Sequence, residues 1–84
     1  MVLVEFYAPT LTTQAEREAF LRELAGVDIH FDAADIEPQG QGRVEFPASD
    51  VDVRDVKHLQ RWLALRPGIR DIRVSLAPDR ATPA

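Results

Sequence analysis

The feature that most constrains the fold is the order in which patterned segments follow one another. The chain opens on alternating apolar residues (Val2, Val4 and Phe6), and two more alternating stretches and a closing one follow, separated by two segments with helix-capping residues. Alternation of period two indicates strands, whereas apolar residues three and four positions apart indicate helices. The order therefore predicts strand, helix, strand, strand, helix, strand, an architecture that names no reaction.

The first helix is predicted over Gln14–Ala25. Thr13 precedes it and Glu16 follows three positions later, which is the pattern of a capping box, and Gly26 comes directly after the last helical residue. The residues expected to face the core are Phe20, Leu21 and Leu24.

The second helix is predicted to begin after Asp52. An aspartate at this position accepts a hydrogen bond from a free N–H of the first turn, and Asp55 is favoured there by the helix dipole. Pro67 and Gly68 stop the helix. Its core face is expected to carry Val56, Leu59 and Leu63.

Four segments are predicted as strands. The first is Val2–Tyr7, the second is the alternating run Val27–Asp32, the third is Gly42–Pro47, and the fourth is Asp71–Leu76. Ala33–Gln41 is expected to form the hairpin connection between the second and third strands, with a strand extension at Ile36.

Two β-α-β units with right-handed crossovers interleave into one antiparallel sheet with both helices on one face. We therefore expect an α+β fold, a ferredoxin-like βαββαβ plait whose four strands lie in the order 4-1-3-2. Residues 1–77 are expected to form a single domain and residues 78–84 a flexible tail, because the end of the chain is rich in proline and small residues.

Composition excludes several classes of function. A net charge of −4 with interleaved acidic and basic residues offers no basic stripe for nucleic acid. The chain has no cysteine, which excludes disulfides and thiolate chemistry, and no apolar run approaches the length of a membrane span. We expect a cytoplasmic protein with no cofactor.

The sequence offers little for catalysis. The two histidines, His30 and His58, fall on different predicted elements, and neither a nucleophile elbow nor a glycine-rich phosphate loop is present. An enzyme of this fold, in the manner of a small dimeric plait with an apolar cavity, would have only those histidines with Tyr7 and Trp62 as participants. Catalysis is the least favoured of three hypotheses.

One segment has residues that bind metals. Asp28, His30 and Asp32 alternate along the second predicted strand and would share one of its faces. Successive side chains on one face are about 6–7 Å apart, too far for three ligands on one straight strand to reach a small ion. Charged residues on an edge strand also discourage pairing with other sheets, and no metal is expected.

The face of the sheet that the helices leave open is a candidate surface. Leu3 and Tyr7 would lie there on a central strand, with Glu5 between Arg43 and Arg73, an arrangement that we interpret as ordinary cross-strand charge pairing. A second candidate interface is the flank of the second helix, which carries His58, Trp62 and Leu65. The alternative for Trp62 is that it closes the edge of the core.

Two stretches resemble small ligand-sensing domains. Arg61–Val74 is similar to the helix, Pro-Gly turn and I-x-x-I-x-V-like strand that end ACT domains, and Asp35–Phe46 is similar to the hairpin of NIL domains. ACT domains hold an amino acid at a dimer interface with an acidic-Pro-Gly turn after the first strand. This chain has Ala-Pro-Thr-Leu-Thr-Thr there, so the resemblance implies ligand-binding residues at Pro9, Thr10, Thr12 and Thr13.

Three hypotheses for the function follow. The first is a non-catalytic regulatory module that binds a small molecule such as an amino acid and acts as a homodimer. The second is an adaptor that binds a protein partner through the open sheet face or the Trp62 flank. The third is the small dimeric enzyme already described.

Overall fold

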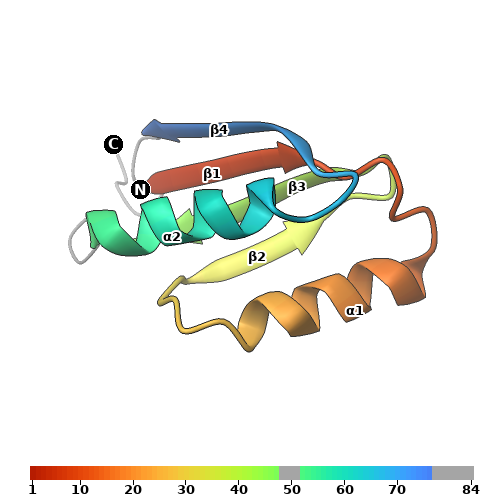
Figure 1. Cartoon of the computed structure of the whole chain (residues 1–84), viewed down its shortest axis with the longest axis horizontal. Coiled ribbons are helices and arrows are strands. Elements are labelled where there is room, and N and C mark those ends of the chain that lie inside the picture. Colours follow the sequence, from red (N-terminus) through yellow and green to blue (C-terminus); the bar gives the residue numbers. More distant parts are fainter. Residues whose placement is uncertain (48–51, 77–84) are drawn as a thin grey trace, which may run out of the picture.

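Two helices and one antiparallel sheet make up the fold (Figure 1). The computed structural model describes residues 1–47 and 52–76. The elements run in the order β1 (Val2–Tyr7), α1 (Gln14–Ala25), β2 (Ala33–Ile36), β3 (Gln41–Phe46), α2 (Val53–Ala64) and β4 (Arg70–Leu76). The sheet has the strand order β2-β3-β1-β4, which confirms the order predicted from the sequence and is compatible with a ferredoxin-like plait.

The core lies between one face of the sheet and the helices. On the central strands, alternate residues are buried: Val2, Val4 and Phe6 on β1, and Val44 and Phe46 on β3. They form one cluster with residues from both helices, namely Phe20, Leu24, Val56, Leu59 and Leu63. The alternation that predicted these strands therefore also predicted which of their side chains are buried.

A capping box starts α1, as the sequence predicts. The Thr13 hydroxyl accepts a hydrogen bond from the Glu16 N–H at 3.2 Å, and Glu16 Oε1 accepts one from the Thr13 N–H at 3.1 Å. The Thr13 hydroxyl also donates to Glu16 Oε1 at 2.9 Å, and the Thr12 hydroxyl donates to it at 3.2 Å. These hydrogen bonds, those from Thr13 most of all, hold the pKa of Glu16 below its usual value.

Asp52 caps α2, which is again as predicted. Its Oδ1 accepts a hydrogen bond from the Arg54 N–H at 2.9 Å, and this bond is the main reason why the pKa of Asp52 lies below its usual value. The helix ends at Ala64, and its core face carries Val56, Leu59 and Leu63. Since these residues recur at intervals of three and four, the helix presents one apolar stripe to the sheet.

The second strand does not lie where the alternation placed it. The prediction of a strand over Val27–Asp32 is wrong, because β2 is Ala33–Ile36. The Ile29 N–H donates to the Val27 carbonyl at 2.8 Å, a tight turn that interrupts extended backbone there. Pairing with β3 begins only at Asp32, whose N–H donates to the Glu45 carbonyl at 2.8 Å.

The turn between β2 and β3 fixes where β2 must lie. The Gly40 N–H donates to the Glu37 carbonyl at 2.8 Å, with Pro38 second in the turn and Gly40 at a φ of +99°. A turn this short makes the residues just before it the partners of β3, so Ile36 lies opposite Gly42. The strand itself thus lies within the expected hairpin connection, where a strand extension was predicted at Ile36 alone.

A β-bulge interrupts the pairing of β4 with β1. Glu5 lies opposite Arg73 and Tyr7 opposite Arg70, so two residues of β4 face Phe6. One of them, Asp71, has a φ of +56° in the left-handed region, which aspartate tolerates better than most residues. The extra residue changes the direction of the side chains at the start of β4.

The two edges of the sheet differ. β2 has four residues and β4 has seven. On β4, the residues that alternate toward the helices are incompletely covered: Ile72 is half-buried, whereas Val74 is 42% exposed and Leu76 is 82% exposed. One edge is thus short, and the other is long with apolar side chains in contact with solvent.

The remaining expectations concern the ends of the chain and the membrane. The boundary at residue 77 and the flexible tail over 78–84 lie outside the described residues. Within residues 1–47 and 52–76, neither helix has the length and apolar character needed to cross a bilayer.

Candidate functional site

A row of alternating charges crosses the open face of the sheet. Glu5 on β1 lies opposite Arg43 of β3 on one side and opposite Arg73 of β4 on the other. Asp35 of β2 lies opposite Arg43 and extends the row to the edge. The placement of Glu5 between the two arginines confirms the prediction, and Asp35 occupies the edge position that was predicted for the run from Asp28 to Asp32.

Only some of the charged residues in this row form ion pairs with one another. Arg43 Nε lies 3.7 Å from Glu45 Oε1 and 3.9 Å from Asp35 Oδ1. In the part of the chain that the structure describes, no ion pair within 4.0 Å involves Glu5, Asp71 or Arg73. Two carboxylates and one guanidinium on the open face therefore have no protein countercharge at ion-pair distance among the described residues.

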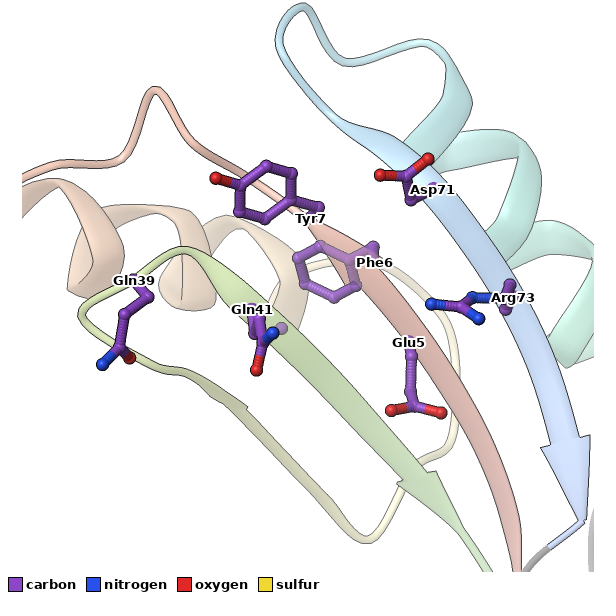
Figure 2. Close-up of a pocket in the computed structure, with 8 residues that line it drawn as sticks. Glu5, Phe6, Tyr7, Gln39, Gln41, Asp71 and Arg73 are labelled. Carbon is purple, nitrogen blue, oxygen red and sulfur yellow. The ribbon is translucent and has the colours of Figure 1, made fainter.

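These three side chains line one hollow, with a volume of about 380 Å³. Figure 2 shows Asp71 and Arg73 extending from β4, Glu5 and Tyr7 on β1, and Gln39 and Gln41 on the side of β3. The wall thus combines both signs of charge with a phenol and two amides. Such a lining can hydrogen-bond a small polar molecule at several points at once.

The bulge and the hairpin turn position this lining. The positive φ at Asp71 adds one residue to β4 beside Phe6, and it brings Asp71 and Arg73 to the same hollow. On the opposite side, the Ala8 N–H donates to the Gly40 carbonyl at 2.7 Å, which ties the turn carrying Gln39 to the end of β1. The positive φ angles at Asp71 and at Gly40 thus help to place the two sides of the hollow.

Tyr7 is held by its neighbour on β4. The Arg70 guanidinium carbon lies 5.3 Å from the centroid of the Tyr7 ring, within the range of a cation-π contact. A Cβ at Gly40 would lie 3.2 Å from the Tyr7 ring, so only glycine lets the turn come this close. The Tyr7 ring is therefore confined between the turn and Arg70, at the rim of the hollow.

In the loop that the resemblance implies as the ligand site, two of the three threonine hydroxyls donate hydrogen bonds within the chain. Thr12 and Thr13 donate to Glu16 in the capping box, as described above. The Thr10 side chain adjoins Gly68, where a Cβ would come 2.7 Å from the Thr10 hydroxyl oxygen. Pro9 is half-buried. None of the four residues lines the hollow on the open face.

The predicted interface residues fall in two places. Leu3 and Tyr7 lie on β1, and both are half-buried. On α2, His58 is exposed and Leu65, just after the helix, is 78% exposed. Trp62 is half-buried, with its ring centroid 5.4 Å from that of Phe20, so it contributes to closing the core between the helices.

The metal-binding candidates are not brought together. Within residues 1–47 and 52–76, no three histidine, aspartate or glutamate side chains lie where they could hold one metal ion. His30 and Asp32 line a hollow of about 430 Å³ with Asp52 and Asp55, and Asp28 is not among its lining residues. Asp28, His30 and Asp32 do not share a strand face, because they precede β2.

Sequence reasoning missed the hollow itself. It placed Glu5 opposite Arg73, with Asp71 on the same open face, but it did not place Gln39 and Gln41 beside them. The bulge was not predicted, and the only signal for it was an aspartate in a position where left-handed backbone is tolerated. Comparison with known proteins adds no assignment, since no protein-family model, curated protein or solved structure matches the chain.

Proposed function

We propose that this chain is a non-catalytic regulatory module, acting as a homo-oligomer, that binds a small zwitterionic molecule such as an amino acid on its open sheet face. The observation that carries the proposal is the hollow in which Glu5, Asp71 and Arg73 lie without an ion pair among the described residues. Charges of both signs side by side match a ligand that also carries both.

Each group of such a ligand has a counterpart in the hollow. Arg73 offers a guanidinium, whose fork of N–H donors suits a carboxylate in two parallel hydrogen bonds. Glu5 and Asp71 are acceptors for an ammonium group. Gln39, Gln41 and the Tyr7 hydroxyl remain for the rest of the molecule, which makes them the groups that would discriminate among side chains.

The size of the site agrees with this ligand class. Pockets for small molecules have volumes of about 300–1,000 Å³, and the hollow falls near the lower end of that range at about 380 Å³. Its lining is mainly polar, so binding would depend on hydrogen bonds and charge more than on apolar burial. A shallow polar site of this kind suits a ligand that binds and leaves readily, as a sensor requires.

Neither histidine is placed to act on a molecule in the hollow. His30 precedes β2 and His58 lies on α2, and neither lines the hollow. A general acid or base must be within about 3 Å of the atom it serves. The strand order, together with one core shared by both helices, supports the finer assignment to a ferredoxin-like plait, the architecture of the ACT and NIL domains that the sequence resembles.

A thermal-shift panel of the twenty amino acids tests the proposal. A ligand at a hundred times its Kd stabilises the folded state by about 2.7 kcal/mol. We expect at least one amino acid to raise the melting temperature, and we expect Arg73→Gln to abolish the shift. Arg61→Gln is the matched control, since Arg61 is an exposed arginine on α2 far from the hollow lining. A flat panel, or a shift that persists in Arg73→Gln, would reject the proposed site.

A second candidate function is an adaptor that binds a protein through the flank of α2. The observation that favours it is Leu65, a large apolar side chain just after α2 that is 78% exposed, together with the exposed His58 on that helix. Leu65→Ser should then weaken capture of the partner on an affinity matrix without changing the melting temperature. If Leu65→Ser captures the partner as well as the unaltered protein does, this flank is not the interface.

A further inference from the structure

The long edge of the sheet carries the apolar surface that the fold leaves uncovered. Val74 is 42% exposed and Leu76 is 82% exposed, both on β4, and Val53 at the start of α2 is 63% exposed. Figure 1 shows the start of α2 and the end of β4 at the same end of the molecule. Three of the four large apolar side chains described as exposed therefore belong to β4 or to the helix end at the same end of the molecule.

An edge strand also has backbone groups that pair with no other strand of its sheet. Proteins usually protect such an edge by keeping it short, charged or covered. β2 follows that rule, with four residues and the exposed Asp35. The second half of β4 does not, since Val74–Leu76 is regular strand without a bulge and carries two exposed apolar residues.

We propose that β4 pairs antiparallel with β4 of a second copy of this chain, about a two-fold axis at Val74, to form a continuous eight-stranded sheet. The inference deepens the homo-oligomeric part of the proposed function, and it does not depend on the ligand. A two-fold axis perpendicular to the sheet keeps each side chain on its own face, so a residue must lie on the axis and face its own copy.

The charges of β4 decide which residue lies on the axis. An axis at Arg73 would place two guanidiniums directly opposite each other, which is destabilising. An axis at Ile72 would centre the pairing beside Asp71, where the positive φ and the bulge break regular strand geometry. Both of these axes also leave Leu76 without an apolar partner on the opposing strand, and an axis at Ser75 would pair only Val74–Leu76 within the described strand.

The axis at Val74 satisfies both faces. On the helix face it places Val74 opposite Val74 and Ile72 opposite Leu76, so the exposed apolar residues of the edge cover one another. On the open face it places Arg73 opposite Ser75 of the second copy, and no like charges meet within the described strand. The strand is thus complementary to itself in this register.

The pairing would also set the two ligand sites beside the junction. Asp71 and Arg73 belong to β4, and the hollow they line would lie next to Ser75 of the second copy. Of the two helices, α2 is the one in contact with β4, so the two α2 helices would flank the axis. A ligand that contacts Arg73 would therefore be near a residue of each copy, which is a route by which ligand and assembly could influence each other.

Sedimentation of the whole chain over a range of concentrations tests the pairing. We expect a dimer for the unaltered protein and a dissociation constant raised by at least about tenfold in Val74→Lys, because two ammonium groups would then meet on the axis. Leu65→Lys is the control, an exposed apolar residue away from β4 (78% exposed, against 42% for Val74) that is changed to the same residue. A monomer at all concentrations, a dimer that survives Val74→Lys, or dissociation by Leu65→Lys would each overturn the proposal.

A single cysteine gives an independent readout if Val74→Lys fails to fold. The chain has no cysteine of its own, so Val74→Cys creates the only thiol. Directly opposed residues of antiparallel strands have Cα atoms about 4.5–5.5 Å apart, a separation that a disulfide spans. Oxidation should yield a covalent dimer from Val74→Cys and none from Leu65→Cys, and the reverse outcome would reject the register. Repeating the amino-acid panel on the Val74→Lys monomer separates failure of the dimer from failure of the ligand site.

Discussion

The guanidinium of Arg66 lies over the indole of Trp62, with its carbon 4.3 Å from the ring centroid. The same guanidinium reaches α1, where Arg66 Nη2 lies 2.8 Å from Glu23 Oε2. On its other side, the Trp62 ring is in contact with Phe20. The two helices are thus joined twice, by the tilted rings of Phe20 and Trp62 and by the ion pair between Glu23 and Arg66.

Replacing Trp62 with alanine should therefore weaken the fold. We expect Trp62→Ala to lower the free energy of unfolding by about 2–3 kcal/mol, below the range for a fully buried tryptophan because this one is half-exposed. Urea unfolding followed by circular dichroism measures the change. Trp62→Phe, which keeps a ring against Phe20, should lose less. Unchanged stability in Trp62→Ala would return the residue to the interface hypothesis.

Acid should weaken the start of α1 through Glu16. Its pKa is lowered in the folded chain, so the unfolded chain binds the proton more readily. The stabilisation is complete above the ordinary glutamate pKa of about 4.3, and it is lost as the pH falls through the lowered value.

Glu16→Gln isolates this effect, because glutamine keeps the capping geometry but does not titrate. We expect the variant to lose less stability than the unaltered protein when unfolding is compared at neutral and acidic pH. Thr13→Ala should cost about 1 kcal/mol at neutral pH. It should also reduce the acid sensitivity, since Thr13 provides the largest part of the pKa shift. If both variants lose as much stability at acidic pH as the unaltered protein does, the prediction is wrong.

A methyl group at Gly42 should not fit. Its Cβ would overlap the edge of the Phe6 ring, which lies across β3 at that position. We expect Gly42→Ala to cost about 1–3 kcal/mol by displacing Phe6 from the core. Gly26→Ala is the matched control: φ is −83° there and the nearest atom would be 3.4 Å away, so thermal unfolding should show little change. Equal effects at both positions would count against the Phe6 packing.

Two roles of Asp71 can be tested separately: its positive φ in the bulge and its carboxylate in the hollow. Asp71→Gly removes the carboxylate and suits the positive φ, so the melting temperature should hold or rise while ligand-induced stabilisation falls. Asp71→Ile should lower the free energy of unfolding by about 1–2 kcal/mol, because a β-branched residue fits the left-handed region poorly. If ligand binding is unaffected in Asp71→Gly, the carboxylate takes no part in the site.

Local signals predicted the elements that local interactions build. Thr13 with Glu16 and Asp52 with the Arg54 N–H gave the start of each helix, because a cap is made within a few residues of chain. The alternation of Val2, Val4 and Phe6 gave both the strand and its buried face. In these cases the pattern and the tertiary contacts favour the same structure.

The failures occurred where pairing with a distant strand decided the outcome. The alternation over Val27–Phe31 resembles a strand, but the turn at Pro38–Gly40 selects Ala33–Ile36 as the partner of β3. The bulge at Asp71 depends on how β4 meets β1, so the aspartate by itself does not specify it. The candidate site needs both features. The sequence therefore predicted some of the residues that line the hollow, but it did not predict that they lie together.

The unequal edges of the sheet determine how large an assembly can become. If β4 is used in a symmetric pair, the described residues leave the two copies of β2 as the edges of the joined sheet, each four residues long and bearing Asp35. A third copy would find no strand end long enough or apolar enough to accept it. Assembly would stop at two chains, because pairing through β4 uses the long edge of each copy. The length of β4 would therefore favour a dimer and not a filament.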